Sequence, residues 1–470
     1  MNYWKLIYII FSLNISQAFR FGNTIFRHDS QNNVQKNNSL TLWSMLNDKW
    51  CKKKESKIDK INGFYGLVGP DVEVSKTDTL YELFTGDGVI QGIFLENGNI
   101  RQISHMVQTE KIQHEKIYGK FLNHMMFLPL YMFLNKIGLI PNVMGLANTA
   151  FMTVGRRFFV LFERDLPYEI SLDFERKTIE TMKRVNIRNI EHFSAHSTVE
   201  ETTGKIYSLE YNVLNKIVSL QEMNESLGLL SKIDVKTRYI PIVHDSYVLP
   251  NSTIFTDSPL LFSFQDLIQG KIPIIFDTGM PTFIHQICRK TGSKTVYSSN
   301  DSFYIFHYAN MTETAEKIDI WASVYESLDF SALNINGKYR RLVLDKNTKT
   351  IEMERNPELE TYNLDFPIKW RDSIILRNVE NKRINGFVIC RGLEIQHKIF
   401  LDDISICGEP VVYDDGTFSR IMCLGYDGEM RGYFLLIDPE TGRVFDFPLS
   451  KKVNIGFHSV FIEKESKMEK

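Results

Sequence analysis

The chain has 470 residues, 43% of them hydrophobic and 24% charged, which is the composition of an ordinary globular protein. Its net charge of −2 gives no electrostatic reason to expect nucleic acid as a partner. Five cysteines, at positions 51, 288, 390, 407 and 423, form no C-x-x-C pair. This pattern is neither a disulfide framework nor a cysteine zinc site.

The N-terminus has the layout of a cleavable secretory signal. Residues 1–18 contain Lys5, the apolar run L-I-Y-I-I-F-S-L and a small-residue end at S-Q-A, and the run is too short to span a bilayer. A mature hydrophobic N-terminus is the alternative. The signal predicts that the protein enters the secretory pathway.

Residues 19–60 form a polar leader rich in Asn, Lys and Ser, with K-K-K at 52–54. Such a segment cannot bury enough apolar surface to fold, so we expect it to be disordered. A signal peptide followed by a basic, polar leader resembles the bipartite targeting sequences of plastids acquired by secondary endosymbiosis. The alternative is a plain linker in a secreted or endomembrane protein.

Residues 61–470 are predicted to form a single all-β domain. Turn sequences recur along it: E-N-G-N at 96–99 is a hairpin signal, and D-K-N-T-K-T, Y-D-D-G and D-P-E-T-G follow near 346, 413 and 438. Short strands with a turn about every eight to twelve residues favour a sandwich, barrel or propeller. No repeat of fixed period distinguishes these three folds.

One strongly apolar segment, residues 121–144, departs from this pattern. Pro129, Lys136 and Pro141 interrupt it, so it is too broken for a transmembrane helix. It is either a buried helical cap or an insert that dips into one membrane leaflet. For the second interpretation, the residues at the membrane and at the mouth for substrate are Phe121, Met125, Met126, Phe127 and Leu130.

Four histidines lie at positions predicted to be in strands or at strand ends. Their contexts are F-S-A-H-S-T (His196), I-P-I-V-H-D-S (His244), I-F-H-Y-A-N (His307) and I-G-F-H-S-V (His458). The aromatic and β-branched run 303–310 predicts a strand with His307 towards its end. The gaps between the histidines are long and irregular, so spacing alone identifies no metal site.

Together these contexts resemble the carotenoid cleavage oxygenase family, which includes retinoid isomerohydrolases and bacterial stilbene-cleaving enzymes. The resemblance runs from about Gly63 to Ile462. It includes L-F-T-G-D-G-V-I-Q-G, similar to the family's F-D-G-D-G-M-I-H-G, then A-N-T-A at 147–150, F-E-R-D-L-P-Y at 162–168, F-H-x-x-N at 306–310 and the terminal G-F-H. The resemblance implies a seven-bladed β-propeller with a helical cap over one face. Four blades would each contribute one of the four histidines to a single Fe(II) on the propeller axis.

The resemblance also implies three carboxylates that orient the metal-binding histidines. Glu163, expected within an apolar strand, and Glu409 match two of the family's glutamates. The third position lies in a stretch similar to L-E-F-P, which here reads L-D-F-P-I-K-W with Asp365. Because Asp is one methylene shorter, we expect either a bridging water or a shift of His307. A further departure is Ser459, where the family has G-F-H-G.

The implied reaction is cleavage of one conjugated C=C bond of a carotenoid or apocarotenoid by O2, giving two carbonyl products. An apolar polyene would reach the site from a peripherally bound membrane, and no catalytic residue beyond the iron ligands is expected. A retinoid-type isomerohydrolase or a stilbene-cleaving dioxygenase is the first alternative. The second is a catalytically inactive propeller that binds a lipid or a protein, which the departures at Asp365 and Ser459 favour.

Overall fold

The computed structural model describes residues 56–72, 79–121, 127–268, 272–332 and 335–464. The predicted signal peptide and the leader up to residue 55 lie outside the described residues and stay predictions. The end of the leader, by contrast, belongs to the fold. Ile58–Lys60 form a short 3-10 helix, and Ile58 is 1% exposed within a core cluster. The packed domain therefore begins slightly before residue 61.

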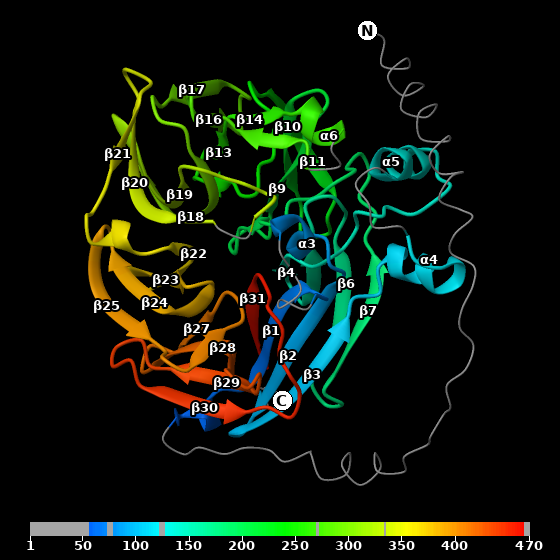
Figure 1. Ribbon diagram of the computed structural model, residues 1–470, viewed down its shortest axis with the longest axis vertical. Coiled ribbons are helices and arrows are strands. Elements are labelled where there is room, and N and C mark those ends of the chain that lie inside the picture. The colour runs from blue at the N-terminus through cyan, green and yellow to red at the C-terminus, as the bar shows by residue number, and fades with distance from the viewer. Residues whose placement is uncertain (1–55, 73–78, 122–126, 269–271, 333–334, 465–470) are drawn as a thin grey trace. The chain divides into compact units, whose positions relative to one another are not determined.

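Within the described residues, seven antiparallel sheets of four or five strands follow one another along the chain and surround a common axis (Figure 1). The chain is thus a seven-bladed β-propeller, which confirms the fold that the resemblance implied. The first sheet joins both ends of the domain. Its strands are β1 (Gly63–Pro70), β2 (Gly88–Glu96), β3 (Asn99–Met106) and the last strand of the described residues, β31 (Ser459–Glu463).

The other six sheets are built from consecutive strands. The second, third and fourth sheets are β4 (Ala150–Val154), β5 (Arg157–Leu161), β6 (Tyr168–Asp173) and β7 (Thr178–Arg184); β8 (Thr198–Val199), β9 (Ile206–Asn212), β10 (Ile217–Met223) and β11 (Leu229–Lys236); and β12 (Tyr247–Val248), β13 (Ser252–Asp257), β16 (Phe283–Cys288) and β17 (Lys294–Ser298). A separate hairpin of β14 (Leu260–Phe262) and β15 (Ile274–Phe276) interrupts the fourth sheet.

The fifth and sixth sheets are β18 (Tyr304–Glu313), β19 (Lys317–Tyr325), β20 (Lys338–Asp345) and β21 (Ile351–Glu354); and β22 (Leu364–Trp370), β23 (Ser373–Glu380), β24 (Arg383–Arg391) and β25 (Glu394–Phe400). The seventh is β26 (Ile404–Ile406), β28 (Ser419–Asp427), β29 (Gly432–Ile437) and β30 (Val444–Pro448), with β27 (Val411–Asp414) also paired to β28.

The hairpin predicted at residues 96–99 joins β2 and β3. Glu96 pairs with Asn99 at its base, and the two central residues, Asn97 and Gly98, have φ angles of 49° and 76°. Positive φ at both central positions is what a type I′ turn requires, and it suits the right-handed twist of the flanking strands. The local sequence therefore determines this turn.

The hydrophobic core is distributed between neighbouring sheets rather than gathered in one centre. One buried cluster combines side chains of the first and seventh sheets, where the Tyr65 and Phe434 rings lie 5.5 Å apart. Another combines the first and second sheets, with Phe64 and Phe158 in edge contact. Because each sheet is covered on both faces by its neighbours, burial of apolar surface stabilises the ring as a whole.

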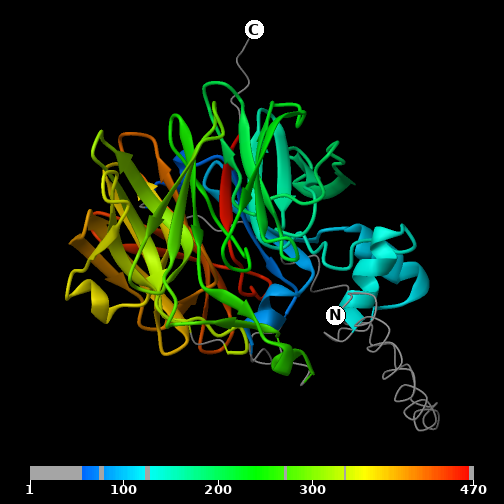
Figure 2. The same ribbon diagram turned by 90° about the horizontal axis from the view of Figure 1, so that it is seen from above.

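The helices in the described residues are short. They are α3 (Leu80–Phe84), α4 (Glu110–Tyr118), α5 (Leu128–Lys136), α6 (Phe264–Ile268) and the 3-10 helices η2 (Ile58–Lys60) and η5 (Leu359–Thr361). Of these, α4 and α5 project from one edge of the propeller (Figure 2). In the described part of the chain, no helix is both long and apolar enough to cross a bilayer.

The apolar insert is not fully buried in its described part. Met132 and Phe133 on α5 are 48% and 47% exposed, and Ile137 and Leu139 after α5 are more exposed still. The buried helical cap, one of the two interpretations of residues 121–144, is therefore wrong for these side chains. Residues 122–126, with Met125 and Met126, lie outside the described residues.

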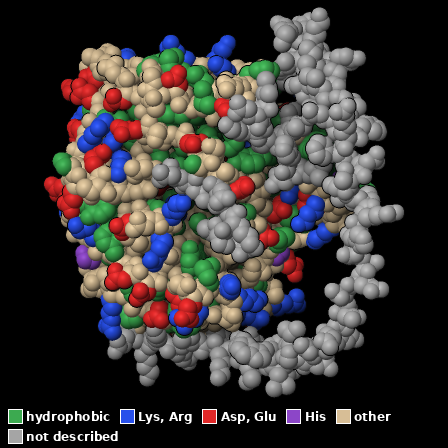
Figure 3. Space-filling view, viewed as in Figure 1, with side chains coloured by type: hydrophobic (Ala, Val, Ile, Leu, Met, Phe, Trp, Pro, Cys, Tyr) green, Lys and Arg blue, Asp and Glu red, His purple; other side chains and the backbone are tan. Residues whose placement is uncertain are grey.

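Charged side chains of both signs are interspersed over the described part of the face seen in Figure 3. This distribution agrees with the small net charge of −2. The cysteines within the described residues, Cys288, Cys390, Cys407 and Cys423, are free.

Candidate metal centre

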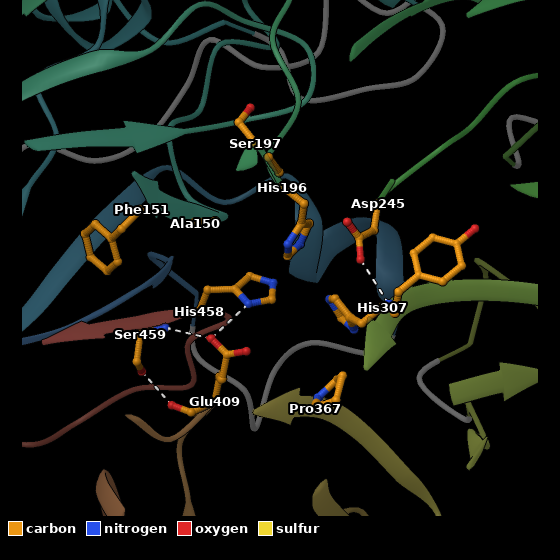
Figure 4. A pocket seen from close by; sticks show the side chains of 12 residues that line it. Ala150, Phe151, His196, Ser197, Asp245, His307, Pro367, Glu409, His458 and Ser459 are labelled. Atoms are coloured by element: carbon orange, nitrogen blue, oxygen red, sulfur yellow. Dashed lines mark hydrogen bonds and ion pairs between the residues drawn. The ribbon is translucent and has the colours of Figure 1, made fainter. Parts of the chain in front are cut away.

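Four histidines from four different sheets converge near the propeller axis. The ligand-capable nitrogens of His196, His244, His307 and His458 all lie within 4.8 Å of one another, and Nε2 of His196 lies 3.0 Å from Nε2 of His244. The ring of His196 lies 4.3 to 5.0 Å from the other three rings, between centroids. Figure 4 shows His196, His307 and His458 turned towards one centre. The structure thus brings together all four predicted residues.

Each of these histidines lies at or next to the strand of its sheet that is nearest the axis. His196, His244 and His458 shortly precede β8, β12 and β31, as expected for strand ends. His307 differs, because β18 continues to Glu313 and the histidine lies inside it. The pairing of β18 with β19 is irregular on both sides of Tyr308. Such bulges interrupt a ladder and turn side chains towards a site.

The other three sheets supply the three predicted carboxylates, so that each of the seven sheets contributes one side chain. Asp365 lies on β22, and Glu409 lies between β26 and β27. The sequence predicted Glu163 within a strand, and this is wrong, because Glu163 lies in the turn after β5. The pairing of β4 with β5 has already ended at Leu161, opposite Ala150, so the backbone is free to turn there.

Three of the four histidines bond to these carboxylates through Nδ1. Nδ1 of His244 is in close contact with Oε1 of Glu163. The other oxygen of Glu163, Oε2, accepts a hydrogen bond from the Tyr211 hydroxyl at 3.1 Å. The remaining pairs are His458 with Oε2 of Glu409 at 3.1 Å and His307 with Oδ1 of Asp365 at 2.9 Å. A carboxylate on Nδ1 fixes the ring and leaves Nε2 as the ligand atom.

Asp365 contacts His307 even though its side chain is one methylene shorter than the glutamate of the family. Its carboxylate reaches His307 directly, so no bridging water is needed. His196 differs from the other three: its backbone N–H donates to Ser194 Oγ at 3.0 Å, and among the described residues no carboxylate bonds to its ring.

Burial favours the uncharged form of two of the rings, His196 and His307. Burial, reinforced by the other three histidines, lowers the pKa of His196 well below its usual value. Burial also lowers the pKa of His307, although Asp365 opposes the shift. At His244 burial acts in the same direction, but the charge and hydrogen bond of Glu163 outweigh it and raise the pKa. Neutral imidazole is the form that binds a metal.

The donor set fits a divalent transition metal. Nε2 of His307 is buried and has no hydrogen-bond partner among the described residues, a state that costs about 1–3 kcal/mol for a polar group. A metal ion at the convergence of the rings would satisfy this nitrogen and its three counterparts. Imidazole nitrogens suit ferrous iron as well as zinc, copper and nickel, so the geometry supports a metal and the choice of iron needs the family.

A cavity of about 210 Å³ lies beside the histidines, and its walls include Phe151, Ser197, Asp245 and Ser459 (Figure 4). Asp245 is not among the residues predicted from the sequence, where its one signal is that it directly follows His244. Its Oδ2 accepts the backbone N–H of Tyr308 at 3.0 Å, and burial raises its pKa to about 6.

Ser459, a departure from the family motif, adds contacts to the site. Its hydroxyl donates to the backbone carbonyl of Glu409 at 2.5 Å, and its N–H donates to Oε2 of the same residue at 3.2 Å. The hydroxyls of Ser459 and Tyr65 lie 3.1 Å apart. A glycine would keep only the backbone bond, so this serine anchors Glu409 beside His458.

Acidification is expected to destabilise the metal-free protein. Burial, the largest cause, lowers the pKa of His105, His192 (to about 4), His196 and His307. Below pH 6.5 the unfolded chain therefore binds more protons than the folded one, and stability falls as the pH falls. The raised pKa values of His244 and of Asp245, the latter to about 6, act in the opposite sense and offset part of this loss. We expect a loss of at least about 2 kcal/mol between pH 6.5 and 5, from about 1.4 kcal/mol per pH unit for each buried histidine.

Urea unfolding of the metal-free protein at the two pH values measures this loss. Equal free energies of unfolding at pH 6.5 and 5 would contradict it. Metal-loaded protein is the control at pH 6.5, where bound metal should raise the midpoint.

Comparison with known proteins places this site in a family. A sequence profile of the retinal pigment epithelial membrane protein family (RPE65) matches residues 59–463. Carotenoid 9,10(9′,10′)-cleavage dioxygenase 1 of Phaseolus vulgaris is 22% identical over 334 residues, which are 66% of this chain and 61% of that protein. The match thus spans about three fifths of the length of this relative.

Solved structures show the same fold. The lignostilbene dioxygenase of Pseudomonas brassicacearum superposes with a TM-score of 0.72 at 17% identity, covering 86% of this chain and 93% of that one. Cobalt-substituted apocarotenoid oxygenase of Synechocystis gives a TM-score of 0.68 at 16% identity, with the same coverage. With the profile match over nearly the whole domain and the ordered motifs, the chain belongs to the retinal pigment epithelial membrane protein family, the carotenoid oxygenases that its sequence resembles.

Proposed function

We propose that the protein is a non-haem Fe(II)-dependent dioxygenase that cleaves one conjugated C=C bond of a carotenoid or apocarotenoid into two carbonyl products. The observation that carries this proposal is the convergence of four histidine nitrogens on the axis. The names of the relatives support it: the Phaseolus protein is a carotenoid-cleaving dioxygenase, and the Synechocystis protein is an apocarotenoid oxygenase that accepts cobalt.

His196, His244, His307 and His458 would hold one iron per chain. Bound Fe(II) would supply the activation of O2. The four ligands are neutral, so they leave the double charge of the ion uncompensated. Glu163, Asp365 and Glu409 orient three of the rings through Nδ1.

The chain needs no acid or base for this reaction. Adding both atoms of O2 across a C=C bond and breaking that bond gives two carbonyl groups, with no proton gained or lost. The described residues accordingly contribute binding, orientation and shape. Asp245 is a carboxylate on the cavity wall that bonds to the backbone of Tyr308 instead of to one of the four histidine rings, and we assign it no proton-transfer role.

Cleavage of a stilbene is the second candidate function. The cavity beside the histidines has polar side chains in its wall, among them Ser197, Asp245 and Ser459, which suit a phenolic substrate better than a carotenoid chain. The lignostilbene dioxygenase of similar fold supports this candidate. A retinoid-type isomerohydrolase would use the same four histidines and differ in its alcohol product.

One experiment distinguishes these functions. Iron is measured in the purified mature protein, and O2 uptake is followed after adding an apocarotenoid or a stilbene. Near-stoichiometric iron with uptake and aldehyde products from the polyene supports the proposal, whereas aromatic aldehydes from the stilbene favour the second candidate. Iron without O2 uptake but with an alcohol product from a retinyl ester indicates an isomerohydrolase. No iron, even after anaerobic loading with Fe(II), would favour a propeller that only binds.

We also propose that the surface formed by α4 and α5 contacts one membrane leaflet. Its aromatic side chains connect the two helices: the rings of His114 and Phe121 lie 5.0 Å apart, and those of Phe121 and Tyr131 lie 5.3 Å apart. Of the predicted mouth residues, Phe121, Phe127 and Leu130 are half-buried. The exposed apolar side chains are Ile117, Tyr118, Met132, Phe133, Ile137 and Leu139.

Replacing both Met132 and Phe133 with aspartate is expected to reduce binding to phosphatidylcholine vesicles at least about 10-fold. Each apolar side chain contributes about 1.5–3 kcal/mol on full burial, and a charge in the acyl region is costly. Co-sedimentation with vesicles measures the effect. Met182→Asp is the matched control, because Met182 is 59% exposed on β7. Equal loss of binding in the control would argue against a specific α4–α5 surface.

A further inference from the structure

The carboxylate of Asp365 makes a closed set of contacts beside His307. Oδ1 accepts the Nδ1–H of His307 at 2.9 Å, and Oδ2 accepts the hydroxyl of Tyr325 at 2.5 Å. The Asp365 side chain is buried. Both oxygens of the carboxylate are therefore occupied by protein donors, one from β18 and one from β19.

Tyr325 is enclosed on more than one side. The edge of the Phe306 ring packs against it, with centroids 5.0 Å apart. Gly337 lies against its other end, where an added Cβ would come within 2.9 Å of the Tyr325 hydroxyl. Burial, with the charge of Asp365, raises the pKa of Tyr325 well above its usual value. The hydroxyl consequently stays protonated and serves as a donor to Asp365.

The backbone after Asp365 is shaped to present this short side chain. The pairing of β22 with β23 shifts register between Asp365 and Ile368, and Phe366 has a φ of 56°, rare for a bulky residue. The Phe366 ring lies 4.6 Å from the ring of His307, between centroids. The guanidinium of Arg377 lies 3.7 Å from the centroid of the Phe366 ring. Strained backbone of this kind persists only where the surroundings enforce it.

We propose that Asp365 and Tyr325 form a matched pair that positions His307, with the tyrosine hydroxyl filling the space and the bonding site that a longer glutamate would need. Tyr325 acts through Asp365, so it is a positioning residue. The inference rests on the proposed metal site. The family motif has glutamate at this position. We nevertheless expect the Asp365→Glu substitution to lower the metal affinity of this protein.

The physical reason is steric. Glutamate places its carboxylate about 1.5 Å farther from the backbone, the length of one C–C bond. In this enclosed corner the added methylene displaces either the ring of His307 or that of Tyr325, and overpacked sites respond by shifting side chains from their rotamers. Replacing Tyr325 with phenylalanine removes the hydroxyl and leaves room for the longer acid. The two substitutions are therefore coupled.

The test measures Co(II) affinity by competition with a chelator, together with the visible absorption spectrum of bound Co(II). The variants are Tyr325→Phe, Asp365→Glu and the double variant. Since partners of metal ligands contribute about 10- to 100-fold to affinity, we expect about 10-fold weaker binding for Tyr325→Phe and a larger loss for Asp365→Glu. The double variant should bind Co(II) more tightly than Asp365→Glu alone.

Tyr297→Phe is the matched control. Tyr297 is buried in the fourth sheet and its hydroxyl donates to Gln286 Oε1 at 3.0 Å, so this variant also loses one buried hydroxyl bond. Its Co(II) affinity and spectrum should equal those of the wild type. Thermal unfolding of all metal-free variants separates a general loss of stability from an effect on the site.

The outcomes separate the inference from the proposed function. Wild-type protein that binds neither Co(II) nor Fe(II) overturns both. Wild-type binding with equal or tighter binding by Asp365→Glu overturns the matched pair alone. A Tyr325→Phe variant with wild-type affinity and spectrum also overturns it, even when its melting temperature falls. If Asp365→Glu does not fold, the Tyr325→Phe result decides.

Discussion

Replacing His307 with alanine is expected to remove metal from the protein and abolish its oxygenase activity. His307 supplies one of the four converging nitrogens, and its Nε2 is buried without a hydrogen-bond partner among the described residues. Loss of a residue that orients a metal ligand weakens metal binding by up to about 100-fold. Loss of the ligand itself should therefore weaken metal binding by more than this. Iron content should fall from about one per chain to near zero, and O2 uptake should stop.

His285→Ala is the matched control for this prediction. His285 is buried, and its Nε2 lies 3.3 Å from a carboxylate oxygen of Asp257, yet it lies outside the cluster of four. Its loss should lower the melting temperature while iron stays near one per chain. Iron retained by the His307→Ala variant would show that the remaining three histidines suffice, and would contradict the four-ligand site.

Removal of residues 459–470 is expected to unfold the domain or leave it insoluble. These residues include β31, which pairs with β1 over five positions, from Gly63 opposite Glu463 to Leu67 opposite Ser459. Phe461 packs on the cluster between the first and seventh sheets, and Val460 and Ile462 pack on the cluster between the first and second. Three apolar side chains at about 1.5–3 kcal/mol each approach the whole stability of a typical domain, about 5–15 kcal/mol.

Removal of only residues 465–470 is the control. It keeps β31 and also Lys464, whose N–H donates to the carbonyl of Asn62 at 3.0 Å and whose Nζ lies 2.5 Å from Glu96 Oε1. This shorter truncation should melt like the full chain. Circular dichroism on heating measures both proteins. A melting temperature of the longer truncation within a few degrees of the full chain would show that β31 is dispensable for closing the ring.

Local sequence contained most of the chemistry of the site. The four histidines and three carboxylates were identified because each lies in a short motif, and the structure brings all seven together. The hairpin at 96–99 was identified because Asn and Gly tolerate positive φ. Such features depend on neighbours in the chain.

Other features had no local signal. Phe366 adopts a positive φ that its own side chain disfavours, and nothing around it in sequence predicts the register shift after Asp365. Glu163 was expected in a strand because its neighbours are apolar, yet the partner strand begins too late to pair with it. The contacts of Asp245 and Tyr325 at the site are with residues distant in sequence, so only the tertiary structure reveals them.

The pattern of strands and turns established an all-β chain, and the motifs established its family and its candidate ligands. The pattern could not distinguish a sandwich, barrel or propeller, since all three alternate apolar and polar residues in the same way. That choice depends on burial between sheets and on the pairing of β1 with β31, from opposite ends of the domain. Ligands as distant in sequence as His196 and His458 meet because closing the ring of sheets brings the inner strands of different blades to one axis.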